Sequence, residues 1–98
     1  MFGTIARAKI KPENRKAFDE LMDRQMGPGE PMEGFVAGYT MWPEKIDDEV
    51  MIVAVFRDRD SYMRNADDPA QDARFREMRA LLESDPEWMD GEFVGGTA

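Results

Sequence analysis

The stretch Val50-Met51-Ile52-Val53-Ala54-Val55-Phe56 is the strongest strand signal in the sequence. Seven apolar residues follow one another there, and most of them are β-branched or aromatic, as is common in strands. An antiparallel strand with one face in water alternates apolar and polar residues, and this run does not alternate. The sequence therefore predicts a strand that is covered on both faces.

Three further strands are predicted around this run. Phe35 to Trp42 precedes it, and the polar connection Pro43 to Asp48 between the two is typical of an antiparallel hairpin. Phe2 to Ile10 alternates with a period of two, which indicates another strand, and Trp88 to Val94 is a weaker final strand.

Two helical regions lie between the strands. Apolar residues recur at helical spacing from about residue 12 to residue 26, which predicts an amphipathic helix. The second region is predicted to be a short helix over Ser61 to Ala66 and a longer one that begins at Asp68-Pro69. Asp68 is a typical N-cap, and Gln71 is placed for a return bond to it. We expect Ser84-Asp85-Pro86 to end this helix, because the residue before a proline avoids helical geometry.

The resulting order, β-α-β-β-α-β, is the α+β plan called split βαβ or ferredoxin-like. This plan places both helices on one face of a four-stranded antiparallel sheet and leaves the other face bare. The length of 98 residues predicts a single domain over residues 1–98, with no spare element to cover that face. We therefore expect a homodimer that packs sheet on sheet as a dimeric α+β barrel. The alternative is a monomer that tolerates an open apolar face.

Composition excludes several functions. The chain has 13 Lys+Arg against 21 Asp+Glu, a net charge of −8, no cysteine and no histidine. Without these two residue types there is no disulfide, no thiolate nucleophile and no histidine base. The clustered acids lack the spacing of a calcium loop, so no metal site is predicted. The acidic balance argues against nucleic acid as a partner, because phosphate contacts need a basic surface.

No part of the sequence predicts a membrane partner or export. No apolar run reaches the ~18 residues of a transmembrane helix. The start, Met1 to Ile5, lacks the basic and long apolar regions of a signal peptide. A cytoplasmic location is therefore expected.

The chain resembles the antibiotic-biosynthesis-monooxygenase-like family of dimeric α+β barrels over about residues 2 to 94. The resemblance is carried by four stretches, namely Ala8-Lys9-Ile10-Lys11-Pro12, the hairpin of Gly34 to Tyr39 with Val50 to Phe56, Ser61 to Ala66, and Asp85-Pro86-Glu87-Trp88. Members include cofactor-free monooxygenases of aromatic polyketides and haem-degrading oxygenases. The haem-degrading members share an iron-ligating histidine, which this chain lacks.

The resemblance implies a cofactor-independent monooxygenase that acts on a small aromatic substrate, a phenol or hydroquinone, with no cofactor. Such an enzyme needs a dry pocket, a few aimed polar groups and a proton acceptor. The candidate catalytic residues are Tyr62, Asn65 and Trp42. The candidate substrate-binding residues are Tyr39, Arg64, Trp88 and Met63.

Each candidate also has a structural interpretation. Trp42, Tyr62 and Trp88 could pack in the core, and Asn65 could end its helix. Tyr39 and Trp42 lie three apart on one strand, so they should point to opposite faces. Arg64 could pair with Asp60, Asp67 or Asp68. Met63 belongs to a set of nine methionines that could line a pocket or fill a thin core.

Two other functions fit the same fold. One is a non-catalytic accessory protein that binds a small apolar or aromatic ligand or serves to dimerise. The other is an isomerase or proton-transfer enzyme with a carboxylate or tyrosine base. An enclosed pocket between helices and sheet that holds tyrosine, asparagine or arginine side chains would favour an enzyme. A cavity filled solid by methionine and phenylalanine side chains would favour the accessory role.

Overall fold

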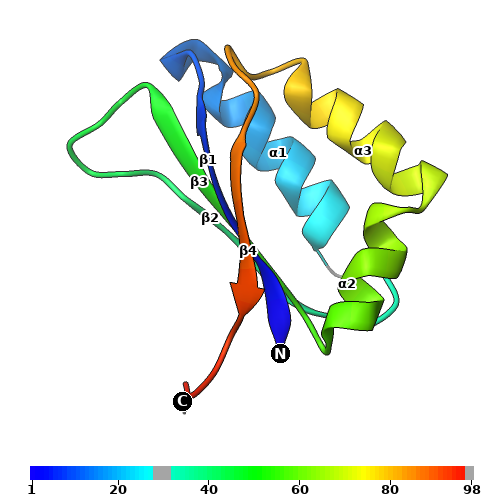
Figure 1. Ribbon diagram of the computed structural model, residues 1–98. Coiled ribbons are helices and arrows are strands. Elements are labelled where there is room, and N and C mark those ends of the chain that lie inside the picture. The colour runs from blue at the N-terminus through cyan, green and yellow to red at the C-terminus, as the bar shows by residue number, and fades with distance from the viewer. Residues whose placement is uncertain (28–31, 97–98) are drawn as a thin grey trace.

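The computed structural model describes residues 1–27 and 32–96. Its strands are β1 (Phe2–Lys9), β2 (Phe35–Met41), β3 (Glu49–Phe56) and β4 (Glu87–Glu92). They form one antiparallel sheet in the order β2-β3-β1-β4 (Figure 1). This is the ferredoxin-like arrangement, so the predicted fold class is confirmed.

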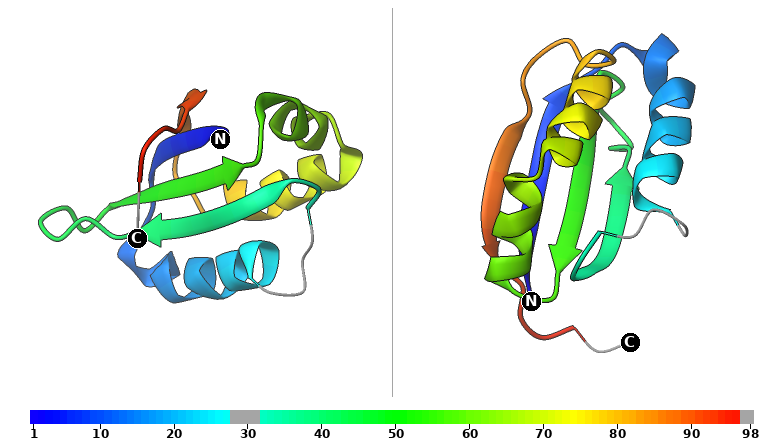
Figure 2. Two further views of the ribbon diagram at one scale, coloured as in Figure 1. Left: turned by 90° about the horizontal axis from the view of Figure 1, so that it is seen from below. Right: turned by 90° about the vertical axis from the view of Figure 1, so that its right-hand side faces the viewer.

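The helices all lie on one face of this sheet, as the views of Figure 2 show. A 3₁₀ turn (Pro12–Asn14) leads into α1 (Arg15–Met26), and the second helical region is broken into α2 (Arg59–Ala66) and α3 (Pro69–Arg79). Asp58 and Asp68 cap the latter two, because their carboxylates accept hydrogen bonds from the backbone N–H of Ser61 and Ala70.

Two details of α3 differ from the sequence prediction. The helix ends at Arg79 rather than at Ser84, because Leu82 leaves the helix and forms a bridge with Ile10 next to β1. Leu82 is thereby buried, which favours this exit over continuing the helix. Gln71 makes no return bond to the cap, since its side-chain oxygen accepts from Arg74 Nε at 3.0 Å.

The core lies between the helices and the inner face of the sheet. Its buried residues come from β1 and the residue after it, from α1, β3 and α3, and from the turn after α3. They are Ala6, Ala8, Ile10, Phe18, Leu21, Met22, Val50, Ile52, Met78 and Leu82. No buried side-chain polar atom in the described part of the chain lacks a hydrogen-bond partner. None of the helices described is long and apolar enough to cross a membrane.

The outer face of the sheet carries an apolar row that crosses all four strands. The register places Tyr39 beside Val53, Val53 beside Ile5, and Ile5 beside Met89. Tyr39 is 64% exposed and Met89 72% exposed, and within residues 1–27 and 32–96 no helix covers them. The β3 stretch therefore presents apolar side chains to both faces, as the sequence predicts.

Candidate functional site

A cavity of about 490 Å³ lies between the inner face of the sheet and the three helices. Its apolar lining comes from α1, β3, α3 and β4, and includes Met22, Met26, Ile52, Phe56, Phe75, Met78 and Trp88. Its polar lining includes Thr4, Gln25, Tyr62, Asn65, Gln71, Asp72, Arg74 and Asp90. An apolar chamber with a few polar groups is the usual form of a small-molecule site.

Tyr62 and Asp90 form the first polar group of this cavity. The Tyr62 hydroxyl on α2 donates a 2.8 Å hydrogen bond to Asp90 Oδ1 on β4. The rings of Phe2 and Phe56 pack edge-on against the Tyr62 ring, with centroids 5.4 and 5.5 Å away. Burial first, and then the bond to Asp90, raises the pKa of Tyr62 to about 12. Tyr62 therefore keeps its proton well above neutral pH and donates it in the hydrogen bond that Asp90 Oδ1 accepts.

Asn65, Arg74 and Gln71 form the second polar group. Arg74 on α3 donates from Nη2 to Asn65 Oδ1 at 3.2 Å and from Nε to Gln71 Oε1 at 3.0 Å. Gln25 on α1 donates to the Arg74 backbone carbonyl at 3.1 Å, which ties the two helices together at this point. Asn65 lies one turn after Tyr62 on α2, so the two polar groups are neighbours along one helix.

Trp88 lines the cavity from β4, where its ring lies 6.1 Å from that of Phe75. It is 47% exposed, so it does not take the buried core position considered from sequence. The reason is its place on an edge strand, which has a neighbouring strand on one side only.

Trp42 lies on the helix side of the sheet but outside the cavity lining. Its ring packs edge-on against Phe18, its Nε1 donates to Asp19 at 2.8 Å, and Arg15 stacks over it at 4.6 Å. These contacts attach it to α1. Tyr39 points to the outer face, so the two aromatic residues do lie on opposite faces as predicted.

The other two sequence candidates lie on the outside of α2. Met63 is 37% exposed and is not part of the cavity lining. Arg64 pairs with Glu33 at 3.0 Å, and not with Asp60, Asp67 or Asp68.

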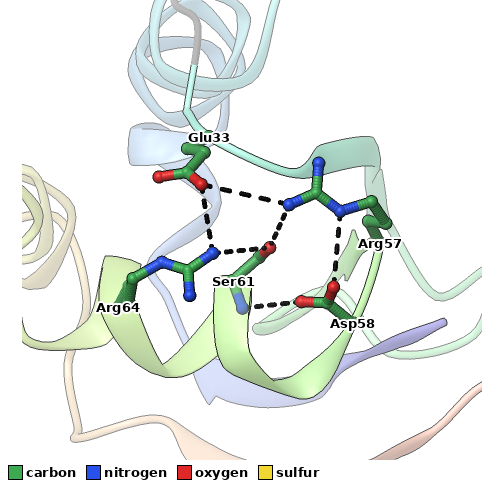
Figure 3. Close-up of polar contacts among 5 residues, drawn as sticks. All are labelled: Glu33, Arg57, Asp58, Ser61 and Arg64. Carbon is green, nitrogen blue, oxygen red and sulfur yellow. Dashed lines mark hydrogen bonds and ion pairs between the residues drawn. The ribbon is translucent and has the colours of Figure 1, made fainter.

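The partners of Arg64 form a polar cluster of Glu33, Arg57, Asp58, Ser61 and Arg64, shown in Figure 3. Arg57 and Arg64 both donate to the Ser61 hydroxyl oxygen and both approach Glu33. The cluster fixes the segment before β2 to the start of α2.

Sequence reasoning did not single out Asp90 or Arg74 as site residues. A signal for Arg74 exists, because Gln71, Arg74, Phe75 and Met78 follow the i, i+3, i+4, i+7 pattern of one helix face. Two polar residues on an apolar helix stripe point to a polar group inside a cavity. Asp90 shares its strand face with Trp88, two residues earlier. Across the described ranges, no three acidic residues converge as metal ligands would.

These features define the class of the protein. It is a ferredoxin-like α+β fold that holds an apolar cavity with two polar groups beneath its helices. The model of the antibiotic biosynthesis monooxygenase family matches residues 1–77, and the chain belongs to this family. The family resemblance predicted from sequence is thus confirmed.

Solved structures share the fold along almost the whole chain. A protein from Chloroflexus aurantiacus J-10-fl is 20% identical with a TM-score of 0.78, and the match covers 99% of this chain and 96% of that one. A variant of SnoaB, a cofactor-independent oxygenase from Streptomyces nogalater, is 19% identical with a TM-score of 0.73, covering 95% and 94%. Rv0793 from Mycobacterium tuberculosis is 16% identical with a TM-score of 0.76, covering 99% and 98%. No curated protein sequence matches the chain significantly.

Proposed function

We propose that the protein is a cofactor-independent monooxygenase that oxidises a small phenol or hydroquinone in the cavity. The observation that carries this proposal is the Tyr62–Asp90 pair, in which a tyrosine orients a carboxylate at the edge of a largely apolar cavity. Membership of the family and the likeness to SnoaB support the same reaction type. The presence of Tyr62, Asn65 and Arg74 in the cavity favours an enzyme over an accessory protein.

The proposed reaction takes its electrons from the substrate. A phenol loses its hydroxyl proton, and the phenolate reduces dioxygen at a ring carbon ortho to the oxygen, where the ring carries a hydrogen. One oxygen atom stays on that carbon, which loses its hydrogen and becomes the second carbonyl of a quinone. The other oxygen leaves as water, so one phenol and one dioxygen give one quinone and one water. The protein has to remove the first proton, hold the ring and exclude bulk water.

The cavity residues divide these tasks. Asp90 accepts the substrate hydroxyl proton on its Oδ2, while Tyr62 holds Oδ1 and sets the orientation of the carboxylate. The Asn65 amide oxygen is engaged by Arg74, and its Nδ2 donates to no other described residue, so it is available for a substrate oxygen. Trp88 and Phe75 stack against the ring.

Oxygen uptake with a panel of phenols and hydroquinones tests the proposal. Wild-type protein should consume oxygen with at least one of them. Tyr62→Phe, Asp90→Asn and Asn65→Ala should each slow the turnover by about tenfold or more, because Asp90 accepts the proton, Tyr62 orients Asp90, and Asn65 positions the substrate. Tyr39→Phe is the matched control, since it removes the same oxygen atom on the outer face and should leave the rate unchanged. No uptake by the wild type, or equal rates in all variants, would refute the assignment.

We further propose that the protein works as a homodimer through its outer sheet face. The apolar row from Tyr39 to Met89 crosses the whole sheet, and Met41 and Met51 extend it on the β2–β3 side. Burial of such a row against a second copy removes exposed apolar surface that a monomer would leave in water. Light scattering at micromolar concentration should give the mass of two chains, and the mass of one chain would contradict the proposal.

A further inference from the structure

We propose that Arg74 binds a carboxylate group of the substrate, so that the substrate is a hydroxylated aromatic acid. This inference deepens the proposed function and rests on it for the hydroxyl end of the substrate. The observation behind it is an arginine inside the cavity that has hydrogen bonds but no counter-ion.

Among the described residues, Arg74 is the one arginine or lysine in the lining of the cavity. Arg15, Arg24 and Arg59 also have no ion pair within the described residues, but none of them lines the cavity. Among the described residues, Arg74 has no carboxylate within ion-pair distance, although the chain carries eight more negative than positive charges. An anionic ligand in the cavity would provide the charged partner that the described residues do not supply to Arg74.

The neighbours of Arg74 orient it without neutralising it. Gln71 and Asn65 accept its hydrogen bonds through neutral amide oxygens. These two bonds use two of the five N–H donors of a guanidinium, and the remaining donors include both hydrogens of Nη1. A guanidinium held in this way is set to receive a planar carboxylate through two hydrogen bonds.

The carboxylates that line the same cavity do not take this role. Asp72 pairs with Arg76 at 3.5 Å on the same helix, and Asp90 accepts from Tyr62. The positive charge of Arg74 therefore stays available, while each acidic side chain already has its own partner.

The two polar groups are anchored one helical turn apart on α2 and line the same cavity. Asn65, which holds Arg74, follows Tyr62 by three residues on α2, a rise of about 4.5 Å along the helix. Apolar residues of the sheet and of α3, among them Ile52 and Phe75, line the space with them. A single benzene ring that carries a hydroxyl group and a carboxylate is small enough for this cavity of about 490 Å³.

Calorimetric titration at neutral pH with two small-molecule probes tests the inference. 4-Hydroxybenzoate and 4-hydroxybenzamide have almost the same shape, but only the first is an anion. Wild-type protein should bind the benzoate about tenfold to a hundredfold more tightly, the range expected for hydrogen bonds to a charged group. Arg74→Gln should bind both probes equally, and Arg74→Lys should keep part of the preference, since it retains the charge without the planar fork.

Arg24→Gln is the matched control. It changes the net charge by the same amount on an exposed part of α1 away from the cavity, and it should keep the wild-type preference. Thermal unfolding of each variant separates loss of binding from loss of folding, and Arg74→Lys covers the case in which Arg74→Gln does not fold.

Three results would overturn the inference. They are equal affinities of the two probes for the wild type, no binding of either probe at millimolar concentration, and a benzoate preference that survives in Arg74→Gln. Failure of the monooxygenase proposal appears elsewhere, as an absence of oxygen uptake. A protein that selects the benzoate without consuming oxygen would retain the Arg74 site and lose only the reaction.

Discussion

Replacing Tyr62 by phenylalanine should remove one contribution to the loss of folding stability that this protein shows at alkaline pH. The pKa of Tyr62 rises from 10.0 to about 12 in the folded state, through burial and the hydrogen bond to Asp90. The folded protein therefore holds this proton more tightly than the unfolded chain does. Its contribution to the free energy of unfolding is fully present below pH 10 and is lost as the pH rises from 10 to 12.

The structure sets the size of this effect. A shift of two pKa units corresponds to about 2.7 kcal/mol of differential stabilisation for a fully shielded group. Tyr62 is only partly buried and Asp90 is exposed, so solvent screening reduces the expected value to about 1 kcal/mol. The difference in unfolding free energy between wild type and Tyr62→Phe should fall by that amount between pH 9.5 and pH 12, as a rough range around the two pKa values.

Urea unfolding followed by circular dichroism across this pH range measures the difference. Lysine deprotonation and global repulsion act equally on both proteins, so the comparison isolates the Tyr62 hydroxyl. Tyr39→Phe provides the parallel control, because it keeps the apolar ring on the outer face and removes a hydroxyl that makes no hydrogen bond within the described residues of the chain. A wild-type to Tyr62→Phe difference that stays constant from neutral to strongly alkaline pH would refute the proposed proton-holding role.

Two further predictions concern the fold and the outer face. Gly34→Ala should destabilise the protein by about 1 to 3 kcal/mol in urea unfolding, because Gly34 has φ of 78° and a Cβ there would lie 2.5 Å from buried Ser61. Gly95→Ala, with a similar φ of 77° in open space, should cost much less, and equal losses would contradict the close packing. Val53→Asp should shift the light-scattering mass from two chains to one, whereas the same change at Val94, outside the sheet, should not; a dimeric Val53→Asp would place the interface elsewhere.

Local sequence patterns were sufficient for most of the fold. The β3 run and the period of two in β1 gave the strands, because side-chain direction alternates along a strand whatever its neighbours are. The end of α3 was wrong by several residues. Leu81 and Leu82 continue the apolar helical pattern, and only the bridge from Leu82 to Ile10, more than seventy residues away in sequence, draws the chain out of the helix.

The candidate site was less predictable, for a related reason. Tyr62 and Asn65 share a face of α2, so their common position in the cavity follows from helical spacing alone. Their partners come from other elements, Asp90 from β4 and Arg74 from α3. Such pairings depend on how the elements pack. The alternation of β4 decides whether Asp90 or Met89 faces the helices. The sequence of this edge strand has no apolar pattern that fixes the choice.

The two faces of β3 connect the cavity to the proposed dimer. Ile52, Ala54 and Phe56 line the cavity, while the alternating residues Met51 and Val53 belong to the outer face. A strand that packs on both faces keeps its register with its neighbours and its distance from the helices. A slip of one residue would move the cavity-lining side chains to the outer face and the outer side chains into the cavity. Dimerisation would thus hold the β3 side chains that line the cavity in place, and the second copy would supply no group to the cavity. Loss of the dimer should therefore weaken ligand binding through a looser cavity, while the preference for benzoate over benzamide, which depends on Arg74, should persist.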